Sequence, residues 1–120
     1  FYGTEIMISE STYAAVSGSV PCRIIDKVRV KGKTEPIMVY EPVGLRSAVE
    51  AKAIAEIELH NEAWNLYAES EFRDAALRFK KLYLADKSNS LAALYFKRCI
   101  AYIRSPPGPE WDAVNRLKEK

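Results

Sequence analysis

Apolar and polar positions alternate in the first forty residues with the period of two that is typical of β-strands. The alternation is clearest over residues 23–31, where Ile24 and Val28 fall on one face and Lys27 falls on the other. This pattern predicts a strand with one solvated side. Asp26 is an anomaly, because it belongs to the apolar face of that strand.

A second short apolar run, residues 37–41, follows a turn-forming stretch at 32–36. The two runs therefore predict an antiparallel β-hairpin. Upstream, residues 5–8 predict a buried strand. Ser9 is placed to cap a short helix that ends near Val16.

The apolar spacing changes from two to about 3.6 after Pro42, which is expected to end the second strand. Residues 43–47 read as a linker, and the Ser47–Glu50 stretch has the form of a capping box that opens a long helix. The helices are predicted at residues 48–69, 72–85 and 90–104.

The helical half contains a spacing of small and aromatic residues that resembles the tetratricopeptide repeat. The positions are Ala63, Leu66, Phe72, Ala75, Phe79 and Leu82. About one and a half repeats are present, and such repeats do not bury their apolar faces alone. The helices are therefore expected to pack on the β-rich piece, on themselves or on a partner chain, and a homodimer is expected.

Composition restricts the classes of function. The 120 residues carry a net charge of +2 with no dense basic stripe, so nucleic acid is not an expected partner. Cys22 and Cys99 form no metal or disulfide motif, which favours a reducing, cytoplasmic setting. No apolar run is long enough to cross a bilayer, so membrane contact is not expected of this segment, and any anchor is expected upstream.

Residues 2–13, 23–33 and 35–41 together resemble the end of the catalytic domain of class III adenylate and guanylate cyclases. The most specific element is the Val-Lys-Gly-Lys run at 30–33, followed by a Val-Tyr pair at 39–40. The helical half is similar to the tail that follows many bacterial cyclase domains, because it ends in a Pro-Pro pair and a Trp-Asp pair.

The resemblance implies an α+β protein in two parts. Residues 1–42 would be the C-terminal strands and hairpin of a ferredoxin-like cyclase domain. Residues 43–47 would be the linker, and residues 48–120 would be a tetratricopeptide-like helical tail.

The resemblance also implies the chemistry of a parent enzyme, a phosphorus-oxygen lyase that makes a cyclic nucleotide from ATP or GTP for signal transduction. Two Mg²⁺ or Mn²⁺ ions would support that reaction in the parent. The metal-binding, base-reading and transition-state positions of the family would all precede Phe1. This chain is therefore expected to hold no cofactor, to contain no catalytic residue and to be inactive without the upstream catalytic half.

One functional position of the family falls within the chain. The first Lys of the Val-Lys-Gly-Lys hairpin, here Lys31, would contact the terminal phosphate of the nucleotide. The alternative is that Lys31 and Lys33 form a solvated hairpin tip.

Other residues have structural interpretations that compete with functional ones. His60 is expected to be a capped or half-buried helix residue rather than a ligand. Arg23 and Asp26 are expected in ion pairs, and the basic residues of the helices, including Lys97 and Arg98, on a solvated face. The recurring aromatic residues are expected to form a core or a dimer seam. The alternative function for the chain is a protein–protein interaction module that uses the helical repeat.

Overall fold

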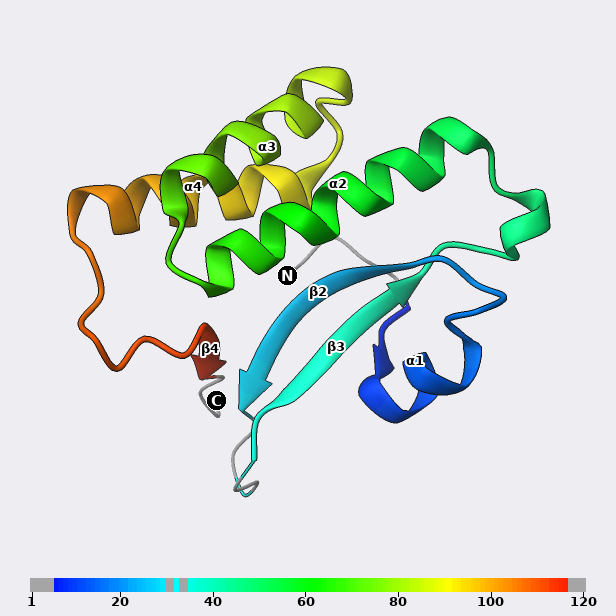
Figure 1. The fold of residues 1–120 in the computed structure, drawn as a ribbon, viewed down its shortest axis with the longest axis horizontal. Helices are drawn as coiled ribbons and strands as arrows, with labels where there is room; N and C mark the ends of the chain where they lie inside the picture. Colours follow the sequence, from blue (N-terminus) through cyan, green and yellow to red (C-terminus); the bar gives the residue numbers. More distant parts are fainter. Residues whose placement is uncertain (1–5, 30–31, 33–34, 117–120) are drawn as a thin grey trace.

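The computed structural model of the chain describes residues 6–29, 32 and 35–116. These residues form one four-stranded sheet and four α-helices, which confirms the α+β class (Figure 1). In chain order the elements are β1 (Ile8–Ser9), α1 (Glu10–Val16), β2 (Cys22–Arg29), β3 (Ile37–Pro42), the 3₁₀ turn η1 (Arg46–Ala48), α2 (Ala51–Ala68), α3 (Phe72–Ala85), α4 (Ser90–Arg104) and β4 (Val114–Arg116).

The sheet has the strand order β1-β3-β2-β4. The predicted hairpin is confirmed, because β2 and β3 pair in antiparallel fashion, and β1 pairs antiparallel with β3. Gly32, between the two hairpin strands, has a φ of +89°, a conformation that favours glycine. The short strand β4, which the sequence pattern did not predict, pairs parallel with the end of β2.

A β-bulge interrupts the alternation expected for β2. Ile24 lies opposite Tyr40 and Asp26 lies opposite Val39, so Ile25 is an extra residue with no counterpart on β3. Ile25 and Asp26 are both fully buried. The prediction of one apolar and one solvated face along this strand was therefore wrong at the bulge.

The N-terminal elements agree only in part with prediction. The Ser9 cap is confirmed, since the Ser9 Oγ accepts a hydrogen bond from the amide of Thr12. The buried strand predicted over residues 5–8 was wrong in its described part. Strand β1 begins at Ile8, and Ile6 and Met7 are more than half exposed.

Helices α3 and α4 have the predicted bounds, but α2 begins three residues later than predicted. Ser47 lies in η1 instead of capping the long helix. Glu50 then takes an extended conformation with a ψ of 151° and becomes the N-cap without a side-chain bond. This extended residue separates the short turn from the helix, so the capping-box prediction was wrong.

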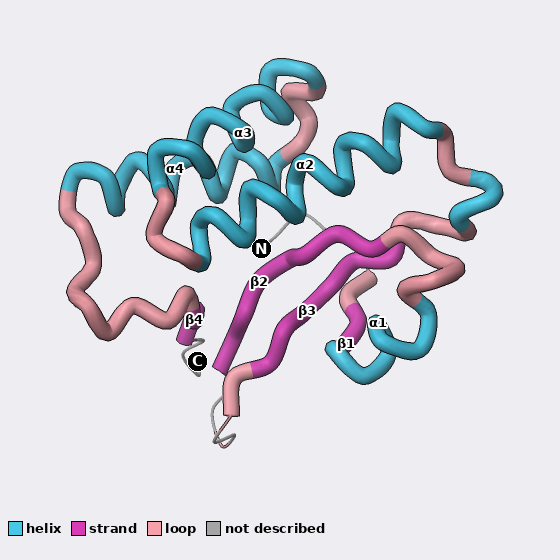
Figure 2. The backbone as a smooth tube through the Cα atoms, in the orientation of Figure 1, coloured by secondary structure: helices cyan, strands magenta, loops and turns pink. Residues whose placement is uncertain are grey.

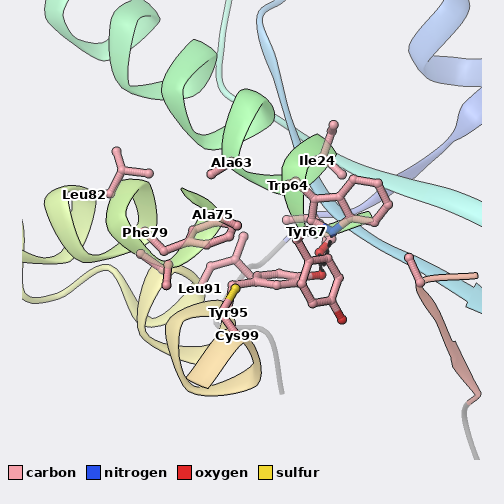
Figure 3. Close-up of a cluster of buried hydrophobic side chains, with 14 of the residues drawn as sticks. Ile24, Ala63, Trp64, Tyr67, Ala75, Phe79, Leu82, Leu91, Tyr95 and Cys99 are labelled. Atoms are coloured by element: carbon pink, nitrogen blue, oxygen red, sulfur yellow. Dashed lines mark hydrogen bonds between the residues drawn. The ribbon is translucent and has the colours of Figure 1, made fainter. Parts of the chain in front are cut away.

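Helix α2 lies along β2 on the side away from β3, α3 packs against α2 and α4 packs against α3, and α1 lies beside β1 and β3 (Figure 2). The sheet and the helices share one hydrophobic core, although the linker at 43–47 separates them in the sequence. It includes Ile24, Ile25 and Tyr40 from the sheet and the aromatic residues of the helices, as Figure 3 shows for part of the cluster. The expectation that the aromatic residues form a core is confirmed.

Trp111 anchors the segment between α4 and β4. Its ring makes edge or tilted contacts with Tyr67, Phe72 and Tyr102, at centroid distances of 5.4, 5.7 and 4.8 Å. Ala113, two residues later, is buried with a φ of +62°. The aromatic contacts and this bend direct the chain back to the edge of β2.

Candidate functional site

Side chains from α2 and α4 form hydrogen bonds with the backbone along the edge of β2 that faces the helices. Strand β4 covers this edge only at Lys27–Arg29. Before that point, side chains bond the backbone where a strand would otherwise pair. Asn61 on α2 supplies two of these bonds: its Oδ1 accepts from the Ile24 amide at 2.8 Å and its Nδ2 donates to the Cys22 carbonyl at 3.1 Å.

His60 supplies the next contact on this edge. Its Nε2 lies 2.6 Å from the Ile24 carbonyl oxygen. Because a carbonyl only accepts hydrogen bonds, Nε2 carries the proton. The pKa of His60 is lowered to about 4, chiefly by burial; the Ile24 bond opposes this shift and the charge of Arg23 adds to it. The imidazole is therefore neutral at pH 7, and its Nδ1 has no hydrogen-bond partner among the described residues.

The burial of His60 corrects the expectation of a half-buried residue, because only 1% of it is exposed. Its ring lies edge-on to Phe79 and Tyr95. A helix pattern alone gave no signal for this position, since the burial comes from contacts with Ile24 of β2 and with the rings of Phe79 and Tyr95 on the other helices.

Tyr95 on α4 supplies the third group on this edge. Its hydroxyl donates to the Ile25 carbonyl at 2.5 Å and accepts from Trp64 Nε1 at 3.0 Å. Burial raises the pKa of Tyr95 well above its usual value, so the hydroxyl keeps its proton. Figure 3 shows Trp64, Tyr67 and Tyr95 close together beside β2.

Asp26 and Arg98 form an ion pair in this region. Arg98 Nη1 lies 3.0 Å from Asp26 Oδ2, and the amide of Lys27 donates to Asp26 Oδ1 at 2.8 Å. The Arg98 guanidinium also lies over the ring of Tyr95, 5.0 Å from its centroid. Arg98 is thus largely buried, and its assignment to a solvated face was wrong.

The ion pairing expected of Arg23 and Asp26 is confirmed. Asp26 pairs with Arg98, and Arg23 pairs with Glu41 at 2.7 Å.

A cleft of about 300 Å³ opens where the hairpin, α2 and the α3–α4 loop meet. Its charged lining consists of Arg23, Glu41, Glu56 and Asp86, and His60 is also among the lining residues. This volume is at the small end of ligand-binding cavities. The N-terminus of α4 lies at the rim, where Asn89 Oδ1 accepts a hydrogen bond from the Ala92 amide. The cleft has the size and polarity for a small polar molecule.

Lys31, the predicted phosphate contact, lies outside the described residues. The strands on either side of it, β2 and β3, are described, and they form the expected hairpin. In the described ranges, no group of three or more His, Cys, Asp or Glu residues is arranged to hold a metal ion. No helix among the described residues is long and apolar enough to cross a membrane.

Comparison with known proteins gives one informative relative. The chain is 25% identical over 108 residues to a protein of Dictyostelium discoideum described as "Adenylate cyclase, terminal-differentiation specific". The match covers 87% of this chain and only 5% of that relative's length. No family model and no solved structure matches. The similarity supports a relationship to cyclases.

Proposed function

We propose that the chain is the C-terminal part of an adenylate or guanylate cyclase whose helical segment braces the last hairpin of the catalytic domain. The observation that carries this proposal is the bonded edge of β2. Asn61, His60 and Tyr95 bind the strand's backbone, and Arg98 binds its buried carboxylate. The helices therefore hold the strand that leads to Lys31.

Two further observations support the proposal. Strands β2 and β3, which flank the Val-Lys-Gly-Lys run in the sequence, pair in antiparallel fashion. The similarity to the Dictyostelium protein covers 87% of the chain, so it includes most of the helical part as well as the strands. Both observations are expected if the hairpin and the helices form one structural unit.

In this proposal the parent enzyme cyclises ATP or GTP with Mg²⁺ or Mn²⁺, and the upstream half supplies the metal ligands and transition-state residues. This chain contributes the Lys31 ammonium, a mobile point charge suited to the terminal phosphate. The chain alone is inactive.

Turnover of ATP and GTP with Mn²⁺ tests the proposal. It is measured for this chain and for the same sequence extended upstream by a complete cyclase domain. Activity in the extended protein alone, reduced when Lys31 becomes Ala and unchanged in Lys87→Ala on the α3–α4 loop, supports the proposal. A folded extended protein that turns over neither nucleotide counts against it.

The alternative, a protein–protein interaction module, has its own support in the solvent-facing side of α3. Leu77 and Leu84 on that helix are 66% and 58% exposed. Exposed leucines on one helix face are typical of a surface that another helix covers.

A further inference from the structure

The outer face of α2 carries an acidic stripe. Glu58 and Glu62 on α2 and Glu69, the C-cap residue that follows it, are exposed and recur at spacings of four and seven residues, which places them on one side of the helix. Ala55 and Asn65 are exposed on the same side. Lys52 is the exposed basic residue of α2, and it lies near Asp86, away from this stripe.

The outer face of α3 carries a basic and apolar stripe. Leu77 and Leu84 are separated by seven residues, so they lie on the same side of the helix. Around them the exposed charges are three basic residues against one acidic residue, Asp74. The basic residues are Arg73, Lys80 and Lys81.

The two stripes lie side by side. A three-residue turn joins α2 to α3, and the helices run antiparallel (Figure 1). Arg78 Nε donates to the carboxylate of Glu62, an ion pair that bridges the groove between the helices. Counting about 1.5 Å per residue in opposite directions from this pair puts Glu69 near the height of Arg73, Glu58 near that of Lys81, and Ala55 near that of Leu84.

We propose that the α2–α3 face binds a second copy of this chain through these stripes. A twofold axis along the α2–α3 groove would place α2 of each copy over α3 of the other. Because this axis runs parallel to the helices, the rotation leaves every residue at the same height along it. Each acidic stripe then meets a basic stripe, with Glu58 facing Lys81, Glu69 facing Arg73, and the small Ala55 leaving room for Leu84.

Charge complementarity identifies the occupant. The α3 stripe requires an acidic helix, and α2 of the same chain is acidic on its outer face and has the small Ala55 near the height of Leu84. An unrelated acidic helix would leave the α2 stripe without an opposite charge. The proposal goes beyond the cyclase function and does not depend on it.

The size of the face predicts a weak dimer. Helices of 18 and 14 residues are about 27 and 21 Å long, and two helices packed side by side offer a face of roughly 500 Å² per copy. Specific interfaces commonly bury about 800 Å² per partner. We therefore expect association in the micromolar range that weakens as salt is added.

Sedimentation velocity of the 120-residue chain with matched charge reversals tests the proposal. One variant carries Arg73→Glu and Lys81→Glu, and the other carries Glu58→Lys and Glu69→Lys. Each variant alone places like charges across the interface, so each is expected to be a monomer at concentrations where the unmodified chain is a dimer. Mixed together, they restore opposite charges at both contacts and are expected to form a heterodimer.

Lys97→Glu, at an exposed position on α4, is the control and is expected to leave the dimer unchanged. Circular dichroism of each variant establishes that it is folded. An unmodified chain that remains monomeric at hundreds of micromolar overturns the proposal. So does a mixture of the two folded variants that stays monomeric, or a dimer that both variants retain.

Discussion

Arg98 of α4 and Asp26 of β2 form an ion pair across 72 residues of sequence, with 3.0 Å between guanidinium and carboxylate. The carboxylate is fully buried and sits beside the bulge at Ile25. A buried charge is stable only with a partner, so the strand and the helix depend on each other for their positions. This contact links the helical segment to the hairpin.

Removing one member of this pair is expected to destabilise the fold strongly. Arg98→Ala removes a charged partner of the buried carboxylate and is expected to lower the free energy of unfolding by about 3–5 kcal/mol. Urea denaturation measures the change. The double variant Asp26→Leu with Arg98→Met removes both charges and should lose less than Arg98→Ala; an equal or larger loss would mean that the charge pair is not the cause.

The stability of the chain is expected to fall as the pH drops from about 6.5 toward 4. His60 takes up a proton near pH 6.5 in the unfolded chain but only near pH 4 in the folded chain. The unfolded state therefore binds more protons in this window, which costs up to about 3 kcal/mol of stability at the acid end.

Urea midpoints at pH 7 and pH 5 measure this dependence. His60 is the single histidine of the sequence, so His60→Gln, which keeps a donor for the Ile24 carbonyl, should flatten the dependence. If His60→Gln keeps the full dependence of the urea midpoint on pH, titratable groups other than His60 cause that dependence.

Asn61→Ala is expected to expose the edge of β2. The change leaves the Ile24 amide and the Cys22 carbonyl without their partner and should cost about 2 kcal/mol. Hydrogen exchange of the Ile24 amide should accelerate more than that of amides paired with β3. Asn65→Ala, at an exposed position on the same helix, is the matched control and should change neither quantity.

The two cysteines are expected to react slowly with a thiol reagent in the folded chain. Cys99 is fully buried, and burial raises its pKa to about 12; burial also raises the pKa of Cys22. Both the accessibility and the thiolate fraction are therefore low. The absorbance released by an aromatic disulfide reagent should rise slowly in buffer and fast in urea, and fast reaction of both thiols in buffer would contradict the burial of Cys22 in β2 and of Cys99 in α4.

The sequence predicted the local elements well and the long-range contacts poorly. The bounds of α3 and α4 follow from helical spacing and polar breaks, and the hairpin follows from alternation around a turn. The bulge at Ile25 does not follow from either pattern, because it depends on how β2 meets Tyr95 and Arg98.

Strand β4 and the burial of His60 were missed for a related reason. Three residues are too few to show a strand period, and the position of β4 is set by the contacts of Trp111 far from β2 in sequence. A lone histidine on a helix likewise gives no sign of the carbonyl that it will meet. The phosphate role of Lys31 stays a prediction.

The most direct test of the account compares nucleotide turnover by the upstream-extended protein with and without residues 48–120. If the helices hold β2, their removal takes away the side chains that bond its backbone and the Arg98 partner of Asp26, and turnover should fall by about tenfold or more while circular dichroism shows that the cyclase domain remains folded. Unchanged turnover in the folded, shortened protein would contradict the claim that the helical segment braces the catalytic hairpin.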